Sequence, residues 1–269
     1  MSGATVRLTG SGLGCENWPR CGDTFLPPKD YHALVEFGNR VVGFLVGLVT
    51  LGAAVVALRV RGLPRWLVAA LWALPVTVLL QGILGGITVL VELHPLTVMA
   101  HFLLSLVAVG IAVVALLGVR EASAPAAPHP PLAANWLALV LVPSALALIV
   151  TGTLVTAAGP HSGGEEIRRI GVLEEALALH VGATALFGIA YLGLVASLVK
   201  ARPLARSELA LAGAVLGLLL VQMAIGEIQW HEALPWGLVL VHVAFGTTIW
   251  AGVVALATRL LLRSLPRLP

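Results

Sequence analysis

Residues 96–119 read LTVMAHFLLSLVAVGIAVVALLGV, an apolar run that contains one histidine and no charged side chain. An α-helix rises 1.5 Å per residue, so about 20 apolar residues cross the roughly 30 Å hydrocarbon core of a bilayer. This stretch is therefore long enough and apolar enough to span a membrane. It places His101 inside the span, where a polar side chain is costly and often functional.

Six further runs have the same character. The seven predicted spans cover residues 33–58, 66–90, 96–119, 133–157, 174–199, 207–230 and 235–263. The whole chain of 269 residues is 59% hydrophobic and only 11% charged, with a mean hydropathy of +0.99. An ordinary soluble domain carries about a quarter charged residues. The composition therefore excludes a soluble domain and predicts an all-α, polytopic transmembrane protein.

The positions of the basic residues predict the orientation of these spans. Lys and Arg concentrate in the connections that follow the first, third, fifth and seventh spans, which the positive-inside rule assigns to the cytoplasm. We therefore expect a multi-pass protein of the cell (plasma) membrane, with the loop of Cys15 and Cys21 extracytoplasmic and the C-terminus cytoplasmic. Because the basic residues follow the loops rather than one face, nucleic acid is not an expected partner.

This orientation puts the N-terminus outside, although no apolar segment precedes residue 33 to carry it across. The opening residues 1–9 (MSGATVRLT) resemble the end of a helix. We therefore expect the natural protein to have one more span than the seven in this chain.

The sequence also contains an internal repeat. A shift of 141 residues aligns Gln81 with Gln222, Gly85 with Gly226, Ile87 with Ile228, His101 with His242 and Asn39 with His180. The Ala- and Pro-rich residues 121–131 fall between the third and fourth spans and are typical of a linker. The chain is therefore predicted to be a duplicated bundle, with an N-terminal half (1–120), a cytoplasmic linker (121–132) and a C-terminal half (133–269).

The paired histidines suggest a chemistry. Two inward-facing imidazoles on different helices of one bundle can supply both axial ligands of a heme, and the repeat gives His180 and His242 this arrangement. Zinc would need a third and a fourth ligand, and nothing suitable accompanies this pair. A proton relay usually brings more intramembrane acids. Simple hydrogen bonding to a neighbouring helix and a proton relay stay open as alternatives.

Polar residues at the start of the first span form a second group. Glu36 and Arg40 lie one helical turn apart, with Asn39 on nearly the same face. They can form an interfacial ion pair, or the carboxylate can take up protons beside a redox site while the arginine binds a carboxylate. Cys15 and Cys21 lack the C-x-x-C-H pattern of covalent heme attachment, so a disulfide that closes the loop is favoured over a redox role.

Nine features of the sequence carry a resemblance to a known family. They are TGSGLGC (9–15), WPRC (18–21), EFGNR (36–40), QGILGG (81–86), His101, TGTLVT (151–156), GPHSG (159–163), His180 and His242. In this order and spacing they resemble the heme A synthase family over nearly the whole chain. The resemblance implies two pseudosymmetric four-helix bundles, of which this chain lacks the first helix.

The resemblance also implies an activity and its site residues. The C8 methyl group of heme O would be oxidised to a formyl group by successive hydroxylations, which gives heme A for terminal oxidases. His180 and His242 would ligate a heme b cofactor, His101 would ligate the substrate heme, and Glu36 would be the functional carboxylate. Cys15 and Cys21 would be the cysteine pair of the outer loop. Expected partners are heme O, heme A and membrane lipid, with heme O synthase and terminal oxidase assembly factors as candidates.

Asn39 departs from the family pattern, because many members have a histidine at this position. An amide is a poor iron ligand, so His101 would hold the substrate heme alone, or together with water or a loop residue such as His32 or His94. Asn39 and Arg40 would then belong to the substrate-heme pocket without ligating iron.

Two other classes of protein compete with this enzyme. A diheme cytochrome b that only carries electrons would usually place its hemes near both membrane faces, whereas all candidate ligands here lie near the outer one. A transporter built from repeats would show broken helices and a polar pathway at mid-membrane depth, and the centres of these spans are mostly Leu, Val, Ala and Gly.

Overall fold

The computed structural model describes residues 1–122, 132–161, 169–202 and 205–264. In these ranges the chain is all-helical, with eight helices and no strand. The helices are α1 (Ser2–Leu8), α2 (Tyr31–Ala57), α3 (Arg65–Leu90), α4 (Pro95–Ala122), α5 (Leu132–Ala158), α6 (Leu173–Lys200), α7 (Arg206–His231) and α8 (Trp236–Ser264). Seven of them, α2 to α8, are long and apolar enough to cross a membrane. The seven predicted spans and the all-α class are therefore confirmed.

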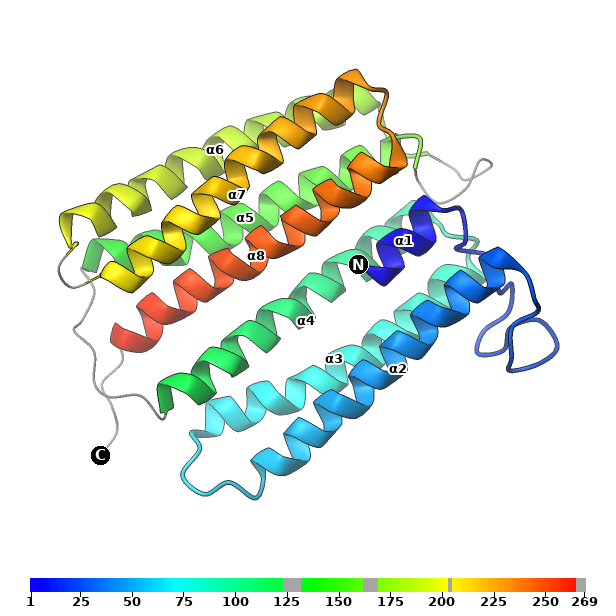
Figure 1. The fold of residues 1–269 in the computed structure, drawn as a ribbon, viewed down its shortest axis with the longest axis horizontal. Coiled ribbons are helices and arrows are strands. Elements are labelled where there is room, and N and C mark those ends of the chain that lie inside the picture. The colour runs from blue at the N-terminus through cyan, green and yellow to red at the C-terminus, as the bar shows by residue number, and fades with distance from the viewer. Residues whose placement is uncertain (123–131, 162–168, 203–204, 265–269) are drawn as a thin grey trace.

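The short helix α1 begins at Ser2 and buries Val6 and Leu8. It packs against α2 and α8, at the end of the bundle that carries the loop of Cys15 and Cys21 (Figure 1). This end is called the disulfide end below. The prediction that the opening residues are helical is confirmed.

The helices are arranged as two groups joined by α4 and α8 (Figure 1). In the C-terminal group, α5 contacts α6 and α8, and α7 contacts α6 and α8, so that α6 and α8 lie on one diagonal of a four-helix bundle. In the N-terminal group, α2 packs on α3 and α3 packs on α4. The two groups meet where α4 lies against α8 and α5.

The bounds of the helices repeat along the chain. The shift of 141 residues that aligns the sequence carries α3 (65–90) onto α7 (206–231), and it carries α2 and α4 closely onto α6 and α8. The turns before α4 and α8 repeat as well, because Glu92 and Leu93 in one and Ala233 and Leu234 in the other have φ angles of 54–60°. Four non-glycine residues in this left-handed region are uncommon, so their match supports the predicted duplication.

The division into two halves with a linker nevertheless stays a prediction. Most of the predicted linker, residues 123–131, lies outside the described residues.

Large apolar side chains cover the surface, as a lipid-facing protein requires. Phe44, Val49 and Ile189 are 66–72% exposed. The interior of the C-terminal group holds Phe187 and Tyr191, and the Tyr191 hydroxyl donates to the Ala212 carbonyl at 2.8 Å. An unpaired hydroxyl in a bilayer would be costly, so this bond ties α6 to α7.

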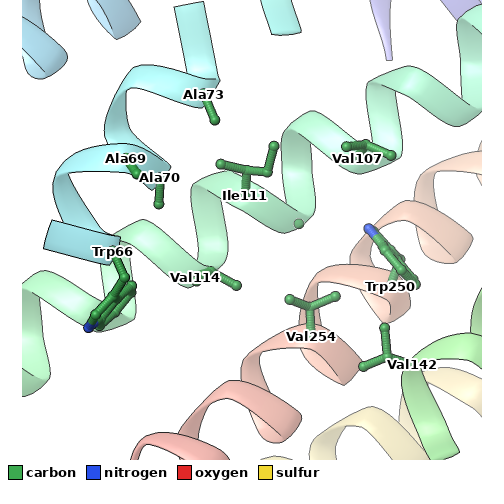
Figure 2. Close-up of a pocket in the computed structure, with 11 residues that line it drawn as sticks. Trp66, Ala69, Ala70, Ala73, Val107, Ile111, Val114, Val142, Trp250 and Val254 are labelled. Carbon is green, nitrogen blue, oxygen red and sulfur yellow. The ribbon is translucent and has the colours of Figure 1, made fainter. Parts of the chain in front are cut away.

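An apolar groove of about 550 Å³ separates α3 from α8 (Figure 2). Trp66 and Ala70 of α3, Ile111 of α4 and Val254 of α8 line it. The indole of Trp250 borders the groove and donates to the Leu106 carbonyl at 2.8 Å, across the seam between α4 and α8. None of the candidate heme ligands lines this groove, so the site lies elsewhere.

Candidate heme site

The candidate ligands share one depth in the bundle. His101, His180 and His242 each lie about two turns after the start of their helices, α4, α6 and α8. Asn39 lies slightly more than two turns into α2. All four helices start at the disulfide end (Figure 1), so the structure gathers these residues near that end, as the repeat predicts.

His180 is held by α5 from the side. Its Nδ1 lies 3.1 Å from the Leu148 carbonyl oxygen and 3.1 Å from the Thr151 hydroxyl. Since a carbonyl only accepts, Nδ1 must carry the proton and donate it to Leu148. Nε2 therefore keeps its lone pair, which is the tautomer that a metal-ligating histidine needs.

Glycine makes room for the His180 ring. A Cβ added at Gly152 would lie only 3.0 Å from Cε1 of His180. The same relation recurs for His242 on α8, because a Cβ added at Gly226 of α7 would lie 3.3 Å from Cε1 of its ring. Both rings therefore lie against bare helix backbone, α5 for His180 and α7 for His242, and each ring plane is restricted by its glycine.

We expect Gly152→Ala to disturb His180 without removing it. The new methyl group would push the imidazole away from α5, at a cost of about 1–3 kcal/mol in a packed site. Heme content of the purified protein, measured from its absorbance, should fall, because this cost corresponds to about a 5- to 150-fold loss of affinity. Gly188→Ala on the same helix as His180 is the matched control, because nothing lies within 4 Å of its added Cβ. Equal heme content in both variants would contradict the conclusion that Gly152 makes room for the His180 ring.

The arrangement fits a heme better than a bare metal ion. His180 and His242 come from diagonal helices, so the interior of the bundle lies between them. In the described part of the chain, no group of three or more His, Cys, Asp or Glu side chains is placed to hold a metal ion. A flat macrocycle with two axial imidazoles needs no third protein ligand, whereas zinc does.

In the N-terminal group a glycine again makes room for a histidine ring, but the position that would complete a histidine pair is Asn39. A Cβ at Gly85 would lie 3.0 Å from Cε1 of His101, as Gly226 lies against His242. Across from it, Asn39 accepts a hydrogen bond from the Ser2 hydroxyl at 2.6 Å. The Asn39 oxygen is thus engaged by α1, and no hydrogen bond joins Asn39 to His101.

Glu36 and Arg40 hold the loop at the disulfide end. The Glu36 carboxylate, 4% exposed, accepts from the Cys15 backbone N–H at 2.6 Å and from Arg40 at 2.5 Å. Arg40 in turn donates to backbone carbonyls of the loop: Cys15, Asn17, Pro19 and Arg20. Both terminal nitrogens of its guanidinium donate to the chain, which favours the ion pair and a loop-anchoring role for Arg40.

The loop itself is closed by a disulfide. Cys15 and Cys21 are bonded and buried, with Cα atoms 4.5 Å apart, so the favoured reading of this pair is confirmed. Trp18 packs on α3, where a Cβ at Gly86 would lie 2.6 Å from its ring. The loop therefore lies over the helix that seats His101, next to Gly85.

The other histidines have local partners. Nδ1 of His32 lies 2.9 Å from the Ser11 hydroxyl, and Nδ1 of His94 accepts from the Leu96 backbone at the start of α4. His161 donates from Nε2 to the Leu234 carbonyl, and His231 pairs with Glu227 at the surface. His129 lies outside the described residues. That His32 or His94 supplies a second ligand to a substrate heme stays a prediction.

Sequence reasoning missed one contact of the site and left another without a role. The Leu148 carbonyl sets the tautomer of His180, but a backbone acceptor leaves no mark in the sequence. Gln81 and Gln222 were singled out by the repeat alone; in the structure each donates to the backbone carbonyl of its histidine, at 2.9 Å to His101 and at 3.0 Å to His242.

The fold and the site define a polytopic helical membrane protein with histidines paired across a bundle. Residues 29–160 match the family described as cytochrome oxidase assembly protein. This match covers Glu36, Asn39 and His101, while His180 and His242 lie beyond it. Residues 29–160 are therefore similar to the cytochrome oxidase assembly family, and individual relatives confirm the resemblance to the heme A synthases.

Two heme A synthases are among these relatives. That of Symbiobacterium thermophilum is 42% identical over 105 residues, which are 39% of this chain and 34% of that protein. That of Geobacillus kaustophilus is 33% identical over 130 residues, 46% of this chain and 39% of that protein. A shorter stretch of 57 residues is 39% identical to a protoheme IX farnesyltransferase of Halobacterium salinarum. The chain thus matches little more than a third of the length of these synthases.

Proposed function

We propose that the chain oxidises the C8 methyl group of heme O to a formyl group, by successive hydroxylations, and so makes heme A. The observation that carries the proposal is the pair of imidazoles on the diagonal helices α6 and α8, one of them fixed by Leu148 in the ligating tautomer. The names of the relatives support heme as the substrate class.

The residues divide between two hemes. His180 and His242 would hold a resident heme b, whose chemistry is electron transfer. His101, seated on Gly85, would hold the substrate heme in the N-terminal group. The closed loop over α3 would cover that substrate and keep water from it, with Trp18 packed on Gly86.

Glu36 and its neighbours have narrower roles. Glu36 is proposed to take up protons released by the oxidation, from a position where Arg40 and the Cys15 N–H hold its carboxylate. Asn39 would line the substrate pocket without ligating iron. Arg40 would shape the pocket by holding the loop, since its donors are used by loop carbonyls.

The protein would act in the plasma membrane, with the disulfide end extracytoplasmic and the C-terminus cytoplasmic. The basic residues at the opposite ends of the helices support this orientation. A farnesylating enzyme that makes heme O, and assembly factors of terminal oxidases, would be its partners on either side of the reaction. The common depth of all candidate ligands argues against a carrier that moves electrons across the membrane.

The test is to express the chain in cells that supply heme O and to identify the extracted hemes by mass. Heme A is the expected product, and cells that express the His101→Ala variant should accumulate heme O instead. If heme b copurifies but heme O is recovered unchanged from the wild type, the chain is a cytochrome rather than the proposed enzyme.

A further inference from the structure

The same unpaired polar atoms occur around two histidines. In the pair α3 and α4, and again in the pair α7 and α8, a glutamine donates its amide N–H to the backbone carbonyl of a histidine twenty residues further along. Gln81 donates to His101, and Gln222 donates to His242. In both, the glutamine Oε1 and the histidine Nδ1 are buried and have no partner in the described structure. A donor and an acceptor are thus left over at each site.

Chemistry fixes the direction of each amide. A carbonyl can accept only from the NH₂ end of the glutamine, so Oε1 must point away from the histidine backbone. Ser105 reinforces this in the N-terminal group, because its hydroxyl contacts the Gln81 amide nitrogen and donates to the His101 carbonyl at 3.1 Å. The corresponding position in the C-terminal group is Gly246, which lacks a side chain, so Gln222 alone makes the contact there.

The glutamine and the glycine seat lie on the same face of one helix. Gln81 and Gly85 are one turn apart on α3, and Gln222 and Gly226 are one turn apart on α7. The glycine supports the ring while the glutamine, one turn away, binds the backbone of the same histidine. The unpaired Oε1 and Nδ1 atoms therefore share one seam between two helices.

We propose that Gln81 and Gln222 are positioning residues whose amide oxygen accepts the Nδ1–H of His101 and His242 through one buried water. The two atoms make no direct bond, and a water between them satisfies both buried groups. With Nδ1 protonated, Nε2 presents its lone pair to the iron, as the Leu148 carbonyl arranges directly for His180. The inference rests on the proposed heme site, and it extends to these histidines the second partner that ligating imidazoles usually have.

The test uses the full-length protein with its bound heme b and measures the midpoint potential of that heme. Removing the acceptor in Gln222→Leu makes His242 a weaker electron donor, so the potential should rise relative to wild type. Gln222→Glu keeps an acceptor oxygen in either protonation state and should not raise it. Asn135→Leu removes an amide near the start of α5, at the end of the bundle away from the disulfide end, and should leave the potential unchanged.

The outcomes separate this inference from the proposed function. A potential that stays at the wild-type value in Gln222→Leu, while heme remains bound, would show that the glutamine only braces the helix and would overturn the inference. If Gln222→Leu binds too little heme to measure, Gln222→Asn, which withdraws the amide by one methylene, should show the same upward shift. Failure of the wild type to make heme A would contradict the proposed enzyme but leave this measurement intact.

Discussion

Replacing either His180 or His242 by alanine is expected to leave the purified protein without its resident heme b. The two imidazoles come from opposite helices of one bundle, and among the described residues of α5 to α8 no other histidine lies at their depth. Loss of a residue that hydrogen-bonds to a metal ligand already costs about 10–100-fold in metal affinity. Loss of the ligand itself should cost more. Heme b content should therefore fall below about a tenth of wild type, read from the Soret band against protein concentration.

Two further variants make this result specific. His231→Ala removes a histidine whose side chain is 70% exposed and pairs only with Glu227, so it should keep full heme b content. His101→Ala should keep heme b and lose the substrate heme, because His101 belongs to the other helix group. A full low-spin heme b spectrum in both His180→Ala and His242→Ala would remove the pair from the site.

The helices could be predicted because a bilayer imposes a length and a composition on each span. The predicted runs and the observed helices α2 to α8 begin and end at nearly the same residues, since charged or turn-forming residues mark both ends. The repeat was visible for a similar reason: His101 and His242 are rare polar residues within apolar runs. Their structural equivalence, each against a glycine, follows from that spacing.

The contacts that orient the site could not be predicted in the same way. Leu148 acts through its carbonyl, and any residue offers one, so its bond to His180 has no sequence signature. The engagement of Asn39 by Ser2 depends on where α1 lies against α2. Arg40 was expected to form an ion pair or to bind a carboxylate, and the path of the disulfide loop decides that it binds Glu36 and four loop carbonyls.

Glu36→Gln is expected to lower the yield of heme A by about 100-fold or more, the usual scale for loss of a proton-transfer group, while heme b stays bound. Glutamine keeps the shape of the side chain and an oxygen for the Cys15 N–H, but it cannot take up a proton. The measurement is the heme A to heme O ratio in extracted hemes, with heme b content measured on the same sample.

Arg40→Gln separates proton uptake from loop anchoring. This variant removes the contacts of Arg40 with the loop carbonyls but leaves the Glu36 carboxylate and its bond to Cys15. If Glu36 only anchors the loop, both variants should lose heme A to the same extent, and the loop should become equally sensitive to protease in both. If the carboxylate takes up protons, Glu36→Gln should stop heme A formation while Arg40→Gln retains a measurable part of it. An unchanged heme A yield in Glu36→Gln would leave the residue with its observed contacts alone, as the buried anchor of the disulfide loop.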